Sequence, residues 1–185
     1  METGGEGKAM RRGCWILACG LLLWQSANVR AEKLVLVAGG KDPKEPALAK
    51  DAKLNGPFGV DFGKEDSLFI VEMTGNRIRW VAEDMLKTTA GTGVKGSAGD
   101  GGPGGAAHFN GPHAIAVGPS GDLFVADTWN QRVRRIDART GTIATVVGTG
   151  RKGFSGDGGP ADKADFGGIY CIAFSPSGDR MVLTD

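Results

Sequence analysis

The fold is decided by residues 125–137, which read VADTWNQRVRRID. Short apolar runs rich in Val and Ile stand on both sides of the polar TWN segment, which is typical of two strands joined by a turn. Residues 70–82 repeat the pattern as IVEMTGNRIRWVA, 55 positions earlier. Residues 121–127, GDLFVAD, have a later counterpart at 178–185, GDRMVLTD. Such spacing predicts a repeat architecture.

Each repeat predicts a meander of four short strands. The apolar runs are separated by Gly, Pro, Asn and Asp, and no amphipathic helix pattern intervenes. The PSGD segments at 119–122 and 176–179 place Pro and Gly as a tight turn needs them. Four antiparallel strands repeated around an axis form a β-propeller blade, so we expect an all-β propeller. The expected strands are 57–62, 67–73, 77–82 and one ending near Ala90, then 113–118, 122–127, 132–137 and 142–148.

The repeats resemble the NHL repeat family of six-bladed propellers. The resemblance covers residues 33–185 and implies four-stranded antiparallel blades in an incomplete ring. The second repeat has Gly104 where the family pattern usually has alanine, and the first repeat lacks the glycine-rich block between residues 41 and 53. The motifs that carry the resemblance are GTG at 148–150, GDGGPA at 156–161, GDGGP at 99–103 and the stretch 125–137.

The expected organisation is a leader followed by one incomplete propeller. A propeller closes with about four to eight blades, and about two and a half are present. We therefore expect the front part of a longer protein or a subunit that closes its ring by assembly. The expected parts are a signal peptide at 1–31, a propeller segment at 32–185, blade 1 at about 57–90, blade 2 at about 112–148, a partial blade 3 at about 168–185, and a strand at 33–38 that completes a last blade outside this sequence.

The N-terminal residues have the pattern of a secretory signal. Basic residues at positions 8, 11 and 12 precede an apolar run from Cys14 to Trp24, and a polar stretch then ends at Ala31. The apolar run is too short to span a bilayer, which takes about 18 or more residues. We expect cleavage near Ala31 and export to the periplasm, the medium or the cell surface, with no transmembrane segment after the signal is removed.

Net charge argues against two classes of binding partner, and cysteine content leaves one thiol to explain. The chain has 22 Lys or Arg and 21 Asp or Glu, and removal of the leader leaves a net charge of −1. A nearly neutral domain has no long-range field to attract nucleic acid or anionic lipid, so neither is an expected partner. Cys171 is the one cysteine outside the leader. Its place in an alternating apolar run predicts a buried strand residue rather than a nucleophile.

Strand direction predicts where a ligand would bind. The loop that enters the first strand of a blade and the hairpin between the second and third strands emerge at the same edge, which we call the rim. Loops on a rigid scaffold usually carry the binding residues, so we expect ligand contact at the rim. The rim candidates are Glu72, Asn76, His108, Asn110, His113, Asp127 and Trp129.

Several polar residues also have a simpler structural explanation. Asp127 and Arg132 stand five apart across a hairpin, as do Glu72 and Arg77, so an ion pair in each blade is expected in preference to catalysis. No residue is assigned a catalytic role.

Metal binding is a weaker alternative at two places. Asp100 and Asp157 lie in the GDGGP segments, where we expect them to cap turns, although calcium could also use their oxygens. His108 and His113 are the two histidines, and a catalytic zinc usually takes three protein ligands. We therefore expect no cofactor and keep Ca and Zn as alternatives.

The sequence leads to two hypotheses about function. The first is an exported, non-catalytic scaffold that presents its rim to a protein, a peptide or a glycan. The alternative is a metal-assisted hydrolase or lyase of the kind that the resemblance suggests, similar to gluconolactonase-like or peptide-amidating-lyase-like propellers. Most ligands of such a metal would then lie downstream of Asp185.

Overall fold

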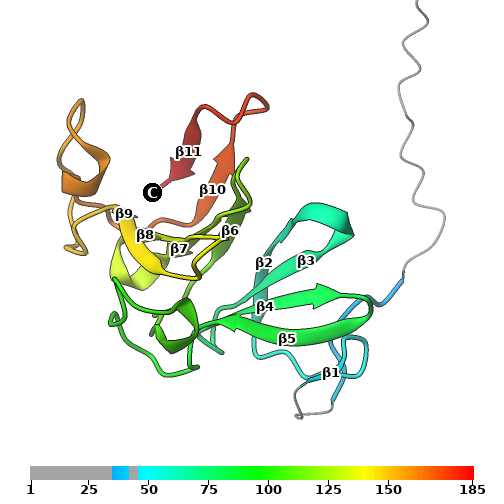
Figure 1. The fold of residues 1–185 in the computed structure, drawn as a ribbon. Helices are drawn as coiled ribbons and strands as arrows, with labels where there is room; N and C mark the ends of the chain where they lie inside the picture. The colour runs from blue at the N-terminus through cyan, green and yellow to red at the C-terminus, as the bar shows by residue number, and fades with distance from the viewer. Residues whose placement is uncertain (1–34, 42–45) are drawn as a thin grey trace, which may run out of the picture. The chain divides into compact units, whose positions relative to one another are not determined.

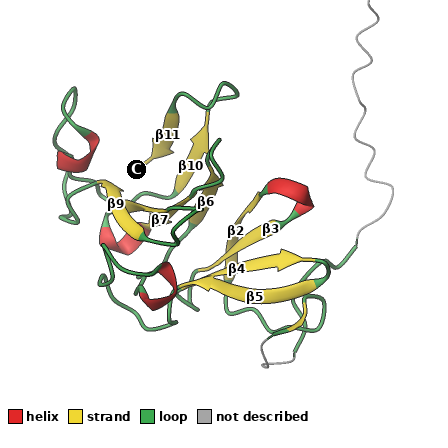
Figure 2. Ribbon diagram, viewed as in Figure 1, coloured by secondary structure: helices red, strands yellow, loops and turns green. Residues whose placement is uncertain are grey.

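The computed structural model describes residues 35–41 and 46–185, which belong to one unit, residues 35–185. Strands and single turns of 3-10 helix are the regular elements of this part of the chain (Figure 2). None of its helices is long and apolar enough to cross a bilayer. The expected signal peptide, residues 1–31, lies outside the described residues, so its cleavage stays a prediction.

The first repeat forms a five-stranded antiparallel sheet in the order β1-β5-β4-β3-β2 (Figure 1). Four of its strands lie where the sequence predicts them. The short strand β1 was not expected, and it pairs with the outer strand β5. The bounds are β1 Ala47–Leu48, β2 Pro57–Phe62, β3 Leu68–Glu72, β4 Arg77–Ala82 and β5 Met85–Ala90.

The second repeat forms a four-stranded antiparallel sheet, β6 to β9 in sequence order, and the third contributes the hairpin β10-β11. The fold is thus all-β with antiparallel blades, as predicted. The bounds are β6 Ala114–Val117, β7 Leu123–Asp127, β8 Arg132–Ile136, β9 Ile143–Val147, β10 Cys171–Phe174 and β11 Met181–Thr184. The 3-10 turns are η1 Lys64–Asp66, η2 Gly104–Ala106, η3 Thr128–Asn130 and η4 Ala161–Lys163.

The repeats bury their apolar faces against one another. One core cluster joins Val71 and Ile78 of the first sheet to Ile115 and Val125 of the second. A separate cluster joins the second sheet to the third repeat. Each fully buried Val or Ile side chain stabilises the fold by about 1.5–3 kcal/mol. A single repeat would expose the side chains that the neighbouring repeat buries, so it would lack much of this stabilisation.

The first strands of the three repeats are neighbours. Strand β6 packs beside β2 on one side and beside β10 on the other. The approach of β2 to β6 is close enough to require Gly59, because a Cβ at that position would collide with the backbone oxygen of His113. These contacts bring the strand starts of different repeats together at the rim.

The structure differs from the sequence expectations at Cys171 and at residues 35–38. Cys171 lies in a strand as expected, but the prediction that it is buried is wrong. The inward side chain at this point of β10 is Ile172, which packs toward the second sheet, so Cys171 on the opposite face is exposed. Residues 35–38, the described part of the strand expected at 33–38, form no strand within the described residues.

Candidate functional site

At the rim, the loop that enters the first strand of a repeat is hydrogen-bonded to the hairpin between its second and third strands. The backbone N–H of Trp129, in the hairpin after β7, donates to the oxygen of Asn110, in the loop before β6, at 3.1 Å. The first repeat has the same contact, in which the N–H of Gly75 donates to the oxygen of Asn55 at 3.0 Å. The two loops therefore meet at one edge, as strand direction predicts.

An acidic side chain at the end of the second strand ties these loops together in every repeat. Glu72 accepts a hydrogen bond from the N–H of Asn55 at 3.0 Å, and Asp127 accepts one from the N–H of Asn110 at 2.8 Å. Asp185 accepts one from the N–H of Gly168 at 2.6 Å. Glu72 and Asp127 are fully buried, so their carboxylates bind the backbone of the chain.

Burial also sets the proton affinity of Asp127. Its carboxylate accepts a hydrogen bond from Nδ2 of Asn130 at 2.8 Å and lies 3.8 Å from Nη1 of Arg134. Loss of hydration outweighs these favourable contacts and raises the pKa of Asp127 to about 6.

The ion pairs predicted across the hairpins are present in one repeat and rearranged in the other. Arg77 Nε lies 3.1 Å from Glu72 Oε2, as predicted. In the second repeat Asp127 and Arg132 are register partners, but the ion pair of Asp127 is formed with Arg134. Arg132 instead lies 3.8 Å from Asp100, because the loop before β6 brings that carboxylate over β8.

The GDGGP segment at residues 99–103 lies against the outer strand of the second sheet, β9. The N–H of Gly101 donates to the oxygen of Ile143 at 2.8 Å. Asp100 accepts hydrogen bonds from the N–H and the hydroxyl of Thr145, at 3.1 and 2.6 Å. The expectation that Asp100 caps its own turn is therefore wrong, because its partners come from neighbouring strands.

Arg134 holds this loop to the sheet from within. Its side chain is fully buried and donates to Oδ1 of Asp100 at 2.9 Å, to the oxygen of His108 at 2.7 Å and to the oxygen of Ala98 at 3.1 Å. Burial alone would raise the pKa of Asp100, but the hydrogen bonds from Thr145 and Arg134 lower it below its usual value. We call Arg134, Asp100 and Thr145 the loop clamp.

Asn76 is a rim candidate with a structural role between repeats. Its Oδ1 accepts a hydrogen bond from the N–H of Gly111, in the second repeat, at 3.0 Å. Thr128 makes the corresponding link onward, with its hydroxyl donating to the oxygen of Ile169 at 2.6 Å. These bonds fix each rim loop to the next repeat.

The possible metal ligands are spread out. Asp157 is exposed in the loop before β10, His108 is half-buried beside the loop clamp, and His113 is buried in the rim. Among residues 35–41 and 46–185, no group of three His, Cys, Asp or Glu side chains is arranged to hold a metal ion. The Ca and Zn alternatives stay predictions.

Aromatic side chains occupy the same position of all three repeats. Phe58, His113 and Tyr170 each stand near the start of a first strand, and the ring of His113 lies 4.7 Å from that of Phe58 and 5.2 Å from that of Tyr170. Trp129 of η3 adds a fourth ring 5.8 Å from His113. We call these four residues the aromatic platform. Phe58, Trp129 and Tyr170 are 61%, 48% and 50% exposed, whereas His113 is only 7% exposed.

The sequence prediction named two of these residues and missed Phe58 and Tyr170. The signal was available, because Phe58 follows Pro57 as His113 follows Pro112, and Tyr170 stands at the same point of the third repeat. It was overlooked because single aromatic residues in strands are usually core residues. Their exposure shows only in the structure.

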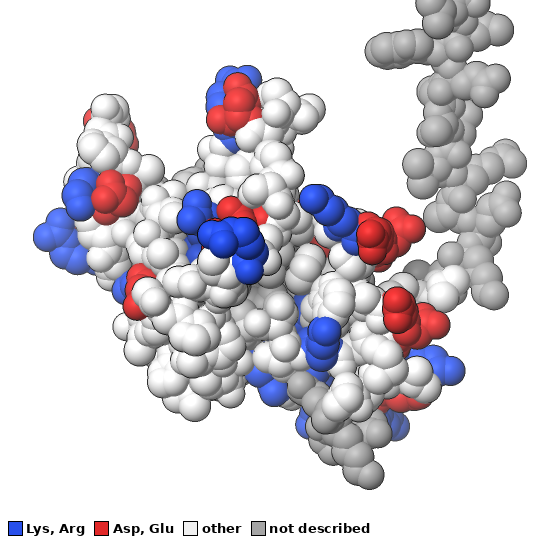
Figure 3. Space-filling model, in the orientation of Figure 1, with Lys and Arg blue, Asp and Glu red and all other residues white. Residues whose placement is uncertain are grey.

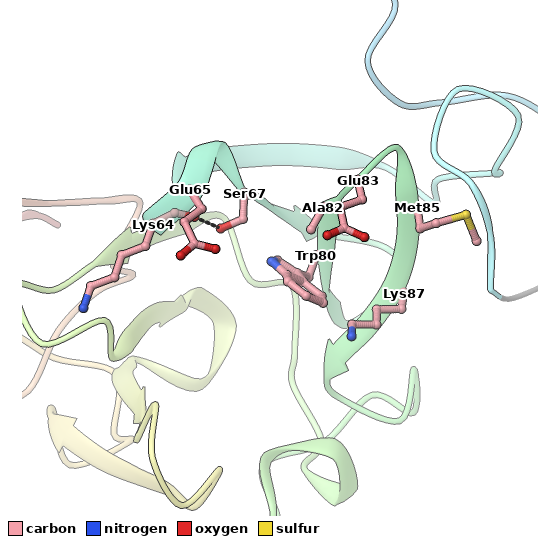
Figure 4. Close-up of a pocket in the computed structure, with 8 residues that line it drawn as sticks. All are labelled: Lys64, Glu65, Ser67, Trp80, Ala82, Glu83, Met85 and Lys87. Atoms are coloured by element: carbon pink, nitrogen blue, oxygen red, sulfur yellow. Dashed lines mark hydrogen bonds between the residues drawn. The ribbon is translucent and has the colours of Figure 1, made fainter.

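A cavity of about 450 Å³ lies at the other edge of the first sheet (Figure 4). The ammonium group of Lys87 lies 3.9 Å from the centre of the Trp80 ring, which occupies one side of the cavity. Charges of both signs line it, so it has no strong preference for an anion or a cation. The lining residues are Lys64, Glu65, Ser67, Trp80, Ala82, Glu83, Met85 and Lys87.

Charged side chains do not gather into one patch on the face seen in Figure 3, where Lys and Arg are interspersed with Asp and Glu. Near the platform, Lys95 lies 5.9 Å from the ring of Trp129. Among the described residues, Lys95 is the one cation that lies over a ring of the platform.

Comparison with known proteins agrees with this architecture. The NHL repeat family model matches residues 109–136. No curated protein matches the chain. A protein of unknown function from Bacteroides thetaiotaomicron VPI-5482 superimposes with a TM-score of 0.63 at 18% identity, covering 80% of this chain and 36% of that one.

Two further solved structures are similar. An auxiliary nutrient binding protein from Bacteroides thetaiotaomicron VPI-5482 has a TM-score of 0.57 at 19% identity, covering 67% of this chain and 33% of that one. Virginiamycin B lyase from Staphylococcus aureus has a TM-score of 0.46 at 21% identity, covering 78% of this chain and 37% of the lyase. The chain spans about a third of the length of these proteins. It contains an NHL repeat and forms an incomplete β-propeller of the NHL type with four-stranded antiparallel blades.

Proposed function

We propose that the chain is an exported binding scaffold that contacts a protein, a peptide or a glycan through its rim. One observation carries the proposal. Glu72 and Asp127, the rim acids of the first two repeats, are fully buried and bonded to backbone, whereas Phe58, Trp129 and Tyr170 leave their rings exposed. Exposed apolar side chains gathered on one surface mark interaction sites.

The same observation favours binding over catalysis. Glu72 and Asp127, the two acids among the rim candidates, do not have exposed side chains. A general acid or base must come within hydrogen-bond reach of the reacting group. The fold is compatible with a binding role, since one protein of similar fold is an auxiliary nutrient binding protein.

The rim can be tested against the opposite edge of the sheets. The purified chain would be screened on peptide and glycan arrays as wild type, as Trp129→Ala at the rim and as Lys87→Ala at the cavity of Figure 4. We expect specific binding that Trp129→Ala removes and Lys87→Ala preserves. Binding lost only with Lys87→Ala would place the site at the other edge and contradict the proposal.

Export and the metal alternative need separate measurements. N-terminal sequencing of the secreted chain should begin close after Ala31, and an uncleaved, cell-retained chain would refute export. Metal analysis of the purified protein should find no stoichiometric Zn or Ca. A stoichiometric metal, together with an activity that a chelator abolishes, would instead favour the hydrolase or lyase.

A further inference from the structure

The rim offers a ligand aromatic surface, and we propose that the aromatic platform binds a neutral saccharide chain. The inference rests on the proposed function and names its ligand class. It is carried by the position, the rigidity and the electrostatics of Phe58, His113, Trp129 and Tyr170.

The platform extends across all three repeats. Phe58 belongs to the first repeat, His113 and Trp129 to the second, and Tyr170 to the third. The three outer rings stand around His113 with interplanar angles of 68°, 67° and 80° to its ring. Several rings side by side suit a chain of linked sugar units better than a single small molecule.

Two rings of the platform, those of His113 and Trp129, are held in place by contacts within the chain. Nδ1 of His113 is hydrogen-bonded to the oxygen of Gly111 at 2.7 Å, which fixes the central ring. The Trp129 ring packs on Gly111, where a Cβ would collide with it. Rings that are already ordered lose little conformational entropy on binding, which favours affinity.

The chemistry of the rings matches a sugar face. An aromatic ring carries negative charge on its face and positive charge at its edge. The C–H groups on one face of a sugar ring are weakly positive and apolar, so they fit against an exposed aromatic face. Phe58, Trp129 and Tyr170 are 61%, 48% and 50% exposed and provide such faces.

The sparse charge against the platform rings argues for a neutral ligand. Glu72 and Asp127, the acids beside the platform in the first two repeats, are buried and cannot pair with a cationic ligand. Among the described residues, Lys95 is the one cation that lies over a platform ring. Single-stranded nucleic acid also stacks on aromatic side chains, but it needs a positively charged groove along its backbone.

Affinity gel electrophoresis tests the proposal with defined probes. The chain would be run in gels containing laminarin, hydroxyethyl cellulose or galactomannan, with alginate as an acidic comparison. We expect at least one neutral polysaccharide to retard the wild-type chain and alginate not to do so. Trp129→Ala and Tyr170→Ala should each weaken the retardation by about tenfold, the effect of losing one stacked ring.

Phe154→Ala is the matched control, because Phe154 is an aromatic residue that is 83% exposed and lies outside the platform. It should bind as wild type does, and circular dichroism should show all three variants folded. No retardation by any neutral polysaccharide would overturn the inference. The inference would also be overturned if all three variants lost retardation equally, or if none of them lost it. Peptide binding at the rim without saccharide binding would overturn this inference and leave the proposed function standing.

Discussion

Two loops with nearly the same sequence behave differently in this molecule. GDGGP at 99–103 lies against β9 and is held by the buried Arg134, whereas GDGGP at 156–160 leaves its Asp157 exposed. The second loop is organised instead around Asp165, which accepts hydrogen bonds from Arg151 and Ser155, both at 3.1 Å. The positions that would align with Arg134 in the third repeat fall after Asp185.

The difference shows that the motif does not fix its own contacts. Burial alone would raise the pKa of Asp100, but hydrogen bonds from Thr145 in the fourth strand, β9, and from Arg134 in the third strand, β8, lower it. The pKa of Asp165 is lowered by hydrogen bonds from Thr149 and Arg151 within its own loop. In the second repeat the loop clamp thus joins the GDGGP segment to strands β8 and β9.

The largest expected effect comes from removing the centre of the clamp. Arg134→Met removes the donor to Oδ1 of Asp100 and to the carbonyl of His108, and it leaves the buried Asp127 without its ion-pair partner, so we expect the free energy of unfolding to fall by about 3–5 kcal/mol. Equilibrium unfolding in urea measures the loss.

The neighbouring Arg135→Met is the control, because Arg135 is exposed and lies 3.9 Å from Asp122 in a surface ion pair. It should change the free energy of unfolding by no more than about 0.5 kcal/mol. Hydrogen exchange should speed up over residues 91–108 in Arg134→Met and stay unchanged over 148–166. Equal effects in the two loops would contradict the comparison.

A pH series tests the buried acid next. The pKa of Asp127 is raised to about 6, so the folded state binds its proton more tightly than the unfolded state does. The contribution of Asp127 to the free energy of unfolding should therefore fall as pH rises from about 4 to about 6 and stay level above that. Asp127→Asn should lack this dependence.

The carboxyl carbon resonance of Asp127 gives a direct readout, and its midpoint should lie near 6. The contribution of Asp100 to the free energy of unfolding should change with pH in the opposite direction. Its pKa is lowered, so the stability that it contributes is present above its usual value of 3.8 and is lost as pH falls through the folded value. A midpoint for Asp127 at or below 3.8 would refute the role of burial.

The matched pair Asp100→Asn and Asp157→Asn compares the two loops most closely, with the smallest effects. Asp100→Asn weakens bonds to Thr145 and Arg134 and should cost about 1–3 kcal/mol in the free energy of unfolding. Asp157→Asn changes an exposed residue and should cost less than about 0.5 kcal/mol. Thermal unfolding of both variants checks the difference, and equal costs would show that the clamp contributes nothing.

Much of the fold was predictable because the same sequence pattern recurs in each repeat. Turn residues and apolar runs recur, so strands β2 to β9 were predicted with ends correct to within about a residue wherever a range was given. Strand β1 was not predicted, because two residues carry no periodicity. The burial of Cys171 was wrong, because alternation alone does not say which of two faces meets the neighbouring sheet.

The site was less predictable than the fold. Strand direction placed the rim correctly, but the roles of its residues depend on contacts between distant segments. Arg134 and Asp100 are 34 positions apart, and Asn76 reaches Gly111 across 35. No local pattern distinguishes a buried, bonded acid from one that is available to a ligand.

We propose that polar contacts such as those of Asp100 hold this fold and that the exposed aromatic residues of the platform bind a ligand. The most direct test measures thermal unfolding and affinity electrophoresis in a neutral polysaccharide for Trp129→Ala and Asp100→Asn side by side. We expect Trp129→Ala to lose retardation with little change in unfolding temperature, and Asp100→Asn to unfold at a lower temperature but still to bind when folded. The reverse pattern, with binding lost in Asp100→Asn and kept in Trp129→Ala, would contradict it.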